Sequence, residues 1–326
     1  AYWGFDCYAI FMLYRRLYQW YQQYGRTDLP WRTTCDAYHI YISEIMLQQT
    51  QVKTVLAKYY QPFLERFPTL SHLAKASEQD VLKQWEGLGY YTRARNLHKA
   101  AQMCAPSLPT SVDGLLQLPG IGKNTAHAIA AFAYHQPVPV LEANVKRVVA
   151  RYYKVKMLDE KTLWNKAHTL LDKDNPFDYN QAMMDVGSLI CTPKNPQCEI
   201  CPLHINCGGK NAPTSYGLKP KKKTTPIIYK HILILFNNKK QQIFLHRRST
   251  NFLQGMYRCV EVDDVSELPA NKEHVGDVKQ VYSHFTLQGA VYRCEDSTVA
   301  DQYEGVWVDA CKVSKLPLSG ADKKVL

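Results

Sequence analysis

Four cysteines in one short stretch constrain this chain more than any other feature. Cys191, Cys198, Cys201 and Cys207 are separated by six, two and five residues. In a long chain with no evident secretory signal, such a set is more typical of a metal or iron–sulfur centre than of disulfides. Zinc sites usually use two Cys-x-x-Cys pairs, and only one pair is present here. The long first gap favours four thiolates around an iron–sulfur cluster, with zinc as the alternative.

Length and charge bound the class of protein. A chain of 326 residues can hold two domains, each with its own core. Its 40 Lys+Arg against 29 Asp+Glu give a formal charge of +11, and with 22 Tyr this balance favours nucleic acid as a partner over a merely solvated basic surface. The apolar opening is interrupted by Asp6 and ends at Arg15-Arg16, so we expect no signal peptide or membrane span and an intracellular protein.

The first part of the chain is predicted to be helical. Apolar residues recur at helical spacing over residues 8–24. A second helix is expected to begin after Asp36, a good capping residue, to run to about Tyr59 and to be broken by Pro62. Glu44 lies beside the apolar stripe of this helix, where burial would raise the pKa of a carboxyl group; a plain exposed side chain is the alternative.

Residues 118–126 read LPGIGKNTA and join two predicted helices. Gly120 and Gly122 permit a turn with positive φ and a close approach of the backbone to a ligand. The amides that open the next helix then offer a site for a phosphate oxygen. Gly-x-Gly alone is also compatible with an ordinary turn, but flanked by Leu-Pro and Thr-Ala it predicts a helix–hairpin–helix.

Composition changes abruptly at Gly208-Gly209. Residues 209–226 are rich in Pro, Gly, Ser and Lys, which predicts a basic linker between residues 1–208 and a second domain at 227–326. That second domain is predicted to be mainly β and small. Its expected strands are residues 232–236, 243–245, 278–282, 290–294 and 306–308.

Taken together, the motifs resemble the MutY family of adenine DNA glycosylases, part of the helix–hairpin–helix superfamily that includes endonuclease III. The matching stretches are residues 29–32, 43–50, 87–91, 118–126, 144–147 and 180–185 and the cysteine loop. The resemblance implies a mainly α N-terminal glycosylase domain with a helix–hairpin–helix and a 4Fe–4S cluster held by Cys191, Cys198, Cys201 and Cys207. A smaller α+β, Nudix-like C-terminal domain would follow; because no Glu-rich Nudix box is present, we expect no nucleotide hydrolysis by it.

The resemblance also implies a monofunctional enzyme of base excision repair that flips adenine, mispaired with 8-oxoguanine or guanine, out of duplex DNA and hydrolyses its N-glycosidic bond. Glu44 matches the family's general acid, and Asn144 matches a residue that helps to position it. Glu142 stands where the family has the Asp of an Asp-Gly-Asn segment, the carboxylate that stabilises the oxocarbenium ion. The extra methylene moves the carboxylate by roughly an ångström, which can cost about 100-fold in rate.

Other roles are carried over from the family by position. Asn124 stands where bifunctional relatives carry a lysine, so it cannot form a Schiff base, and Lys123 is expected to point about 100° away on the helix start. The remaining expected DNA contacts are Gln49, Leu88 and Tyr90 beside the 8-oxoguanine, Trp31, Asn124 and Gln181 around the adenine, Ser283 and His284 in an 8-oxoguanine-reading loop, and Gly120, Gly122 and Lys194 at phosphates.

Two alternative functions remain open from the residues alone. One is an endonuclease III-like glycosylase and lyase, against which Asn124 and the second domain argue. The other is a lesion-binding protein whose chemistry is impaired at Glu142. For the leading hypothesis the partner is double-stranded DNA with 8-oxoguanine·adenine mispairs, and we expect a monomer, in the cytoplasm or nucleoid if the protein is bacterial.

Overall fold

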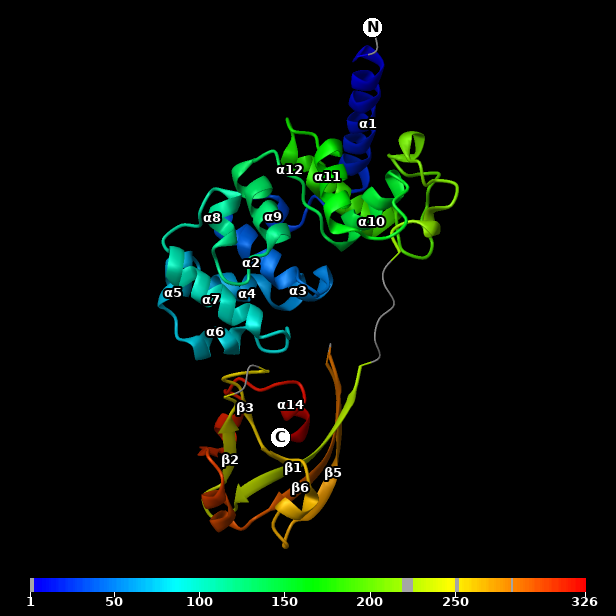
Figure 1. The fold of residues 1–326 in the computed structure, drawn as a ribbon. Helices are drawn as coiled ribbons and strands as arrows, with labels where there is room; N and C mark the ends of the chain where they lie inside the picture. The colour runs from blue at the N-terminus through cyan, green and yellow to red at the C-terminus, as the bar shows by residue number, and fades with distance from the viewer. Residues whose placement is uncertain (1–2, 219–224, 250–251, 283) are drawn as a thin grey trace. The chain divides into compact units, whose positions relative to one another are not determined.

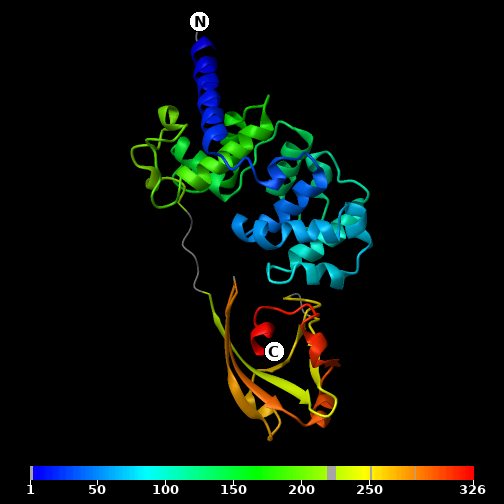
Figure 2. The ribbon, with the colours of Figure 1, turned by 180° about the vertical axis from the view of Figure 1, so that it is seen from behind.

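The computed structural model describes residues 3–218, 225–249, 252–282 and 284–326, with side chains from residue 8 onward. The chain forms two compact units (Figures 1 and 2). Unit 1 combines residues 1–55, 67–74 and 99–221, and unit 2 combines residues 56–66, 75–98 and 222–326.

Unit 1 is helical. Its elements are α1 (Trp3–Tyr24), η1 (Pro30–Arg32), α2 (Ala37–Leu47), α5 (Leu70–Lys75), α8 (Val112–Leu116), α9 (Lys123–Tyr134), α10 (Ala143–Tyr152), α11 (Glu160–Leu170), α12 (Pro176–Asp185), the π-helical turn η2 (Val186–Ile190), η3 (His204–Asn206) and η4 (Pro213–Ser215). Side-chain caps begin several helices: Asp36 accepts a hydrogen bond from the backbone N of His39 at 2.9 Å, and Asp159 accepts one from Thr162 at 2.9 Å. α2 packs against α9, and α1 packs against α12.

The predicted single helix from residue 37 to Pro62 is wrong. α2 ends at Leu47, and separate short helices α3 (Val52–Lys58) and α4 (Tyr60–Arg66) follow. Gln49 interrupts the helical backbone because it adopts a left-handed φ of 58°. Pro62 lies in the first turn of α4, where the missing N–H has no helical acceptor and costs nothing.

Unit 2 contains a seven-stranded mixed sheet with the main order β3-β2-β1-β6-β5, while β4 pairs with β1 and β7 pairs with β2. The strands are β1 (Ile227–Asn237), β2 (Gln242–Arg247), β3 (Tyr257–Arg258), β4 (Val260–Val262), β5 (Glu273–Val281), β6 (Thr286–Cys294) and β7 (Val306–Asp309). Its short helices are α4, α6 (Glu78–Gln84), the start of α7 (Thr92–Cys104), η5 (Val265–Glu267), η6 (Ser297–Gln302), α13 (Ala310–Val313) and α14 (Asp322–Val325). Every predicted strand overlaps an observed one, and the fold class is confirmed.

Both faces of the sheet are buried. Leu233 and Leu235 on β1 join an apolar cluster with Phe244, whereas their neighbour Ile232 joins a different cluster with Leu245. The alternation of side chains along a strand produces this division. β1 and β6 pair in parallel, and a parallel pair requires a long crossover connection, which the intervening strands provide.

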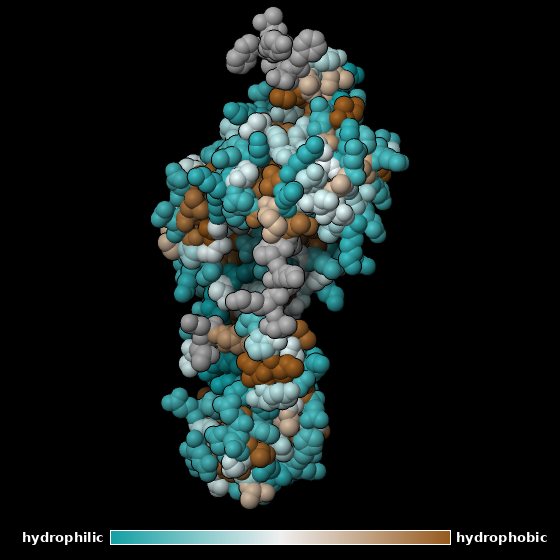
Figure 3. Space-filling model, turned by 45° about the vertical axis from the view of Figure 1, so that its right-hand side comes forward, coloured by the Kyte–Doolittle hydropathy of each residue, from teal (hydrophilic) through white to brown (hydrophobic). Residues whose placement is uncertain are grey.

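The face of the molecule drawn in Figure 3 is largely polar. Figure 3 shows hydrophilic residues over most of the face that it presents, with hydrophobic residues in scattered groups. Among the described residues, no helix combines the length and apolar character that crossing a membrane requires.

Candidate active site and cysteine loop

Glu44 lies on α2 between residues of its apolar face, and it is itself half-buried. Burial and, to a smaller extent, the negative charge of Glu142 raise the pKa of Glu44 from 4.5 to about 7, and Arg32 opposes both effects. Burial disfavours the charged carboxylate because a low-dielectric surrounding solvates it poorly. A substantial fraction of Glu44 is therefore protonated near neutral pH and can donate a proton.

Glu142 caps the N-terminus of α10. Its side-chain oxygens accept hydrogen bonds from the backbone N of Asn144 at 2.9 Å and of Val145 at 3.1 Å. A carboxylate is favourable there because the helix N-terminus carries partial positive charge. Its backbone is extended, with φ −75° and ψ 176°, and Ala143 begins the helix, so this loop has no need of a glycine at position 143.

A hydrogen-bonded chain links Glu142 to the cysteine loop. The side-chain amide of Asn144 donates to Glu142 at 3.3 Å, and its oxygen accepts from the Arg147 guanidinium at 3.0 Å. Arg147 also donates to the carbonyl oxygens of Gly187 at 2.5 Å and Cys191 at 2.7 Å. A side chain at Gly187 would meet the Asn144 Cβ at 2.7 Å, so α12 and η2 come this close to α10 only with glycine at that position.

Cys191, Cys198, Cys201 and Cys207 all line one cavity of the cysteine loop. Arg151 lines the same cavity and donates to the Cys191 sulfur at 3.3 Å and to the Thr192 carbonyl at 2.7 Å. Four thiols with a cationic neighbour suit an anionic iron–sulfur cluster, which thiolates hold and nearby hydrogen bonds tune. Within the described part of the chain, no group of three or more His, Cys, Asp or Glu is arranged to hold a metal ion.

The predicted helix–hairpin–helix turn leads into α9. Gly120 has φ 80°, a conformation that favours glycine, whereas Gly122 has an ordinary φ of −87° and is the N-cap residue of α9, where its carbonyl oxygen accepts from the Ala126 backbone N at 2.9 Å. A positive φ is thus needed at one of the two glycines, not at both. The space around Gly122 is open, with no atom within 4 Å of a Cβ built there, so the turn leaves room for a ligand beside its amides.

The three residues that are expected around the adenine lie on three elements of unit 1: Asn124 on α9, Trp31 on η1 and Gln181 on α12. The Asn124 side-chain oxygen accepts from the Leu141 backbone N at 2.7 Å, which ties the start of α9 to the loop that carries Glu142. Trp31 in η1 and Gln181 in α12 are buried, at 5% and 2% exposure. Gln49 is exposed at the end of α2, and Lys194 is exposed in the loop between Cys191 and Cys198.

Sequence reasoning missed an ion-pair network beside this site. Asp185 at the end of α12 is fully buried and accepts two hydrogen bonds from the buried Arg32, at 2.7 and 3.0 Å. It also accepts from the backbone N and side-chain Nε of Arg26, at 2.8 and 2.9 Å. Burial alone would raise the pKa of Asp185, but these partners hold it below its ordinary value. Arg32 and Asp185 each lie in a stretch that resembles the family, but no pattern in the sequence predicts that they pair across 153 residues.

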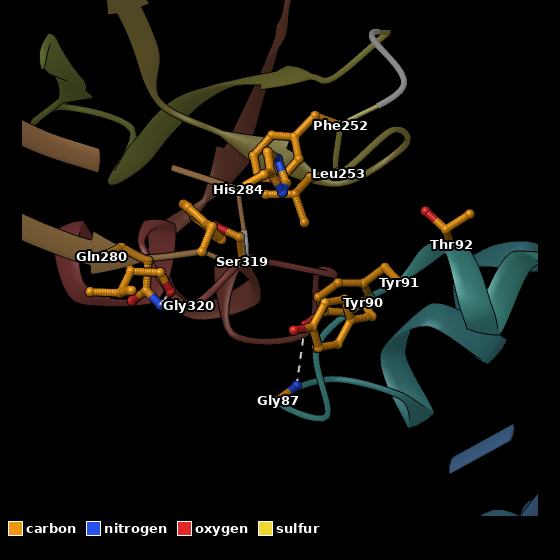
Figure 4. Close-up of a pocket in the computed structure, with 13 residues that line it drawn as sticks. Gly87, Tyr90, Tyr91, Thr92, Phe252, Leu253, Gln280, His284, Ser319 and Gly320 are labelled. Atoms are coloured by element: carbon orange, nitrogen blue, oxygen red, sulfur yellow. Dashed lines mark hydrogen bonds between the residues drawn. The ribbon is translucent and has the colours of Figure 1, made fainter. Parts of the chain in front are cut away.

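Unit 2 contains a second cavity, of about 330 Å³ (Figure 4). Figure 4 shows Phe252, Leu253 and His284 on one side of it and Tyr90 and Tyr91 on the other. The turn that carries Tyr90 contains three left-handed residues, Gly87, Gly89 and Tyr90 itself, with φ 90°, 77° and 50°. Tyr90 is 44% exposed, whereas Leu88 in the same turn is buried.

The cavity includes residues that the sequence did not single out. Phe252 lies edge-on to Tyr282 at 5.0 Å and to His284 at 5.1 Å between ring centroids. Gln280 at the end of β5 and Ser319 also line the cavity. Ser283, predicted to read the oxidised base, lies outside the described residues. An aromatic residue before a glycine turn, as in residues 252–255, is the only sequence signal for Phe252.

Comparisons with known proteins define the class. The sequence profile of the HhH-GPD superfamily of base excision DNA repair proteins matches residues 42–171, and the iron–sulfur binding domain of endonuclease III matches residues 191–204. The chain is thus a base excision DNA repair protein of the HhH-GPD superfamily with an iron–sulfur domain. The predicted 4Fe–4S cluster is confirmed by that second match, which contains three of the four cysteines, with Cys207 three residues beyond it.

Relatives identify the family. The adenine DNA glycosylase of Buchnera aphidicola subsp. Baizongia pistaciae is 39% identical over 245 residues, which cover 73% of this chain and 70% of the relative. That of Buchnera aphidicola subsp. Schizaphis graminum is 34% identical over 301 residues and 86% of each chain. The human adenine DNA glycosylase is 41% identical over 209 residues, 59% of this chain and 38% of the relative. This chain belongs to the adenine DNA glycosylase family.

Solved structures share the fold over part of the chain. A thermostable thymine-DNA glycosylase superposes with a TM-score of 0.56 and 28% identity, over 62% of this chain and 96% of that chain. A non-covalent endonuclease III–DNA complex superposes with a TM-score of 0.52 and 20% identity, over 62% of this chain and 94% of that one. The second likeness concerns the fold alone.

Proposed function

We propose that this adenine DNA glycosylase removes adenine paired with 8-oxoguanine or guanine in duplex DNA and leaves the strand uncut. The observation that carries this proposal is Glu44, a half-buried carboxyl group whose pKa is raised to about 7 by burial and by Glu142. Two carboxyl groups with such different surroundings divide naturally into an acid and an anionic partner.

In the proposed reaction Glu44 gives its proton to a ring nitrogen of the everted adenine while the bond between that base and the sugar C1′ breaks. Adenine leaves as a neutral base, and the sugar is left with oxocarbenium character. Glu142 faces this cation and stabilises or traps it, and water then adds a hydroxyl group to C1′. Asn144 holds Glu142 by the 3.3 Å hydrogen bond described above. Cys191, Cys198, Cys201 and Cys207 would hold the 4Fe–4S cluster, which would have a structural role in shaping the loop of Lys194 for phosphate contact.

A single-turnover assay on a duplex with one adenine opposite 8-oxoguanine tests this function. We expect free adenine, and a strand break only after later treatment with hot alkali. Tight binding without adenine release would support the lesion-binding alternative instead. A strand break without alkali would support the lyase.

Glu142 is expected to limit the rate because its extra methylene displaces the carboxylate by roughly an ångström from where the family's aspartate would hold it. Aspartate caps helices equally well, and its side chain is shorter by one methylene, so its carboxylate lies closer to the backbone. We therefore expect Glu142→Asp to accelerate adenine release, by up to about 100-fold. The matched Glu142→Gln should slow it and shift the high-pH decline of the rate to lower pH, since Glu142 raises the pKa of Glu44. Slower release by Glu142→Asp would mean that the site has adjusted to the longer side chain.

The cavity of unit 2 is the proposed reader of the base opposite adenine. Tyr90 and His284 lie on opposite sides of it, and Phe252 packs against His284. Stacking on an aromatic ring is worth roughly 1–3 kcal/mol per base. We expect Phe252→Ala to lower the preference for 8-oxoguanine over guanine opposite adenine at least about five-fold, measured as a ratio of single-turnover rates at subsaturating enzyme. An unchanged ratio would remove Phe252 from this role.

A further inference from the structure

The chain reaches Glu142 through a short segment, residues 138–141, that follows α9 and precedes α10. This segment is neither helical nor part of a sheet. Prolines at positions 137 and 139 have no N–H group, so they cannot donate to a neighbouring strand. Val140 and Leu141 are nevertheless buried, at 1% and 0% exposure. Because buried backbone N–H and carbonyl groups need hydrogen-bond partners, other parts of unit 1 must supply them.

Asn180 on α12 supplies two of these partners. Its side-chain oxygen accepts from the Val140 backbone N at 2.7 Å, and its amide nitrogen donates to the Val138 carbonyl oxygen at 3.0 Å. The same nitrogen donates to the carbonyl oxygen of Pro176, one turn earlier in α12, at 2.8 Å. Both N–H groups and the oxygen of the carboxamide are therefore used. Asn180 bonds to the segment in the way that one residue of a parallel strand would.

Two side chains of α9 hold the opposite edge of the segment. Nδ1 of the buried His127 lies 2.9 Å from the Pro139 carbonyl oxygen, which can only accept, so this nitrogen carries the proton. The Asn124 oxygen accepts from the Leu141 backbone N at 2.7 Å. The segment is thus fixed from both sides by side chains, with α12 on one edge and α9 on the other.

The position of the Glu142 carboxylate depends on where this segment ends. Glu142 follows Leu141 directly, and its carboxylate is held by the first backbone amides of α10. A displacement of about one ångström at a catalytic group can cost about 100-fold in rate. Asn180 is 1% exposed and two residues removed from Glu142 through its bond to Val140. It can therefore influence the carboxylate without reaching the DNA itself.

We propose that Asn180 is a positioning residue for adenine release, because its carboxamide fixes the segment that places Glu142 against the developing cation. It acts through the backbone of residues 138 and 140 and does not touch the base or the sugar. The inference rests on the proposed function, since it needs Glu142 to stabilise that cation.

The test compares single-turnover adenine release with duplex binding in the full-length protein with its cluster. Asn180→Leu keeps a side chain of similar size and removes the carboxamide. We expect it to slow release from an 8-oxoguanine·adenine duplex about 10- to 100-fold. Binding of the same duplex with an uncleavable 2′-fluoroadenosine should stay within a few-fold of wild type. A merely structural role would instead reduce the amount of active enzyme, which is the amplitude of the single-turnover phase, and leave its rate constant unchanged.

Two further variants identify the cause. Asn165→Leu makes the same substitution at an exposed position of α11 and should keep the full rate. In a Glu142→Gln background, Asn180→Leu should slow release only a few-fold further, because the charge that it positions is already absent. Asn180→Ser is a smaller change that leaves room for a bridging water, and it tests the inference even if Asn180→Leu does not fold. We expect it to slow release at least about five-fold.

The outcomes separate the inference from the proposed function. A wild-type enzyme that releases no adenine, or a Glu142→Gln variant that releases it at the normal rate, overturns the proposed function. Normal rate constants in the folded Asn180 variants, with Glu142→Gln slow, overturn the inference alone. The inference is also overturned if Asn180→Leu has its full effect in the Glu142→Gln background, because Asn180 would then act independently of Glu142.

Discussion

Replacing Glu44 by glutamine is expected to reduce the single-turnover rate of adenine release by about 1,000-fold. A positioned general acid contributes roughly 100- to 10,000-fold, and glutamine keeps the shape of the side chain without the proton. The half-buried carboxyl group is already neutral below a pKa of about 7, so a neutral amide fits the same surroundings. The measurement is adenine release from an 8-oxoguanine·adenine duplex with enzyme in excess.

Binding of that duplex should survive the change. We expect Glu44→Gln to bind the mispair within a few-fold of wild type, because the substitution adds no charge and the glutamine amide keeps an N–H that can donate a hydrogen bond to the adenine. Glu65→Gln serves as the matched control for the same substitution on an exposed helix and should keep the full rate. Near-normal adenine release by Glu44→Gln would assign the acid to another group.

Replacing Asp185 by asparagine is expected to destabilise the protein by about 3–5 kcal/mol. The substitution leaves Arg32 buried without a counter-charge, and a buried charge deprived of its partner is costly. Arg26, 30% exposed at its side chain, can turn toward solvent, but Arg32 cannot. The loss should be visible as a lower midpoint in urea denaturation followed by circular dichroism.

Asp309→Asn is the matched control. Asp309 pairs with Lys312 on the surface of unit 2, at 2.7 Å, and such exposed pairs contribute little to stability because solvent screens them. The contrast between two Asp→Asn changes separates burial from the mere presence of an ion pair. Equal, small effects would mean that Arg32 finds another partner or water.

Asp185 also predicts acid sensitivity. The pKa of Asp185 is held below its ordinary value of 3.8 in the folded protein by Arg32 and Arg26, despite the opposing effect of burial. A depressed carboxyl pKa contributes stability above the unfolded value, and that contribution is lost as pH falls through the folded pKa. Wild type should therefore lose stability below about pH 4, and Asp185→Asn should lose less over the same range.

The class of fold was largely readable from the sequence. Helical periodicity, a cap such as Asp36 and the alternating strands of the second domain are local signals, and the structure contains each of them. The break of the predicted helix at Gln49 was not readable, because its left-handed φ has no strong signal in a non-glycine residue. The short strands β3 and β4 were missed because two or three residues carry no period.

The sequence predicted the features of the candidate site that depend on a single residue and its local surroundings. It did not predict the features that depend on which residues the tertiary fold brings together. Glu44 beside an apolar stripe predicted a raised pKa, and burial supplies that shift. The capping role of Glu142 depends on where α10 begins, and the pairing of Arg32 with Asp185 depends on the tertiary fold. Phe252 joins the cavity of unit 2 only because the loop after β2 meets His284.

The pH dependence of adenine release by the wild-type protein tests the central role of Glu44 most directly. If protonated Glu44 is the acid, the single-turnover rate should be level at low pH and fall about tenfold per pH unit above roughly 7. The same decline should move to lower pH in Glu142→Gln. A rate that stays level well above pH 7, with the protein still folded and bound to DNA, would contradict this account.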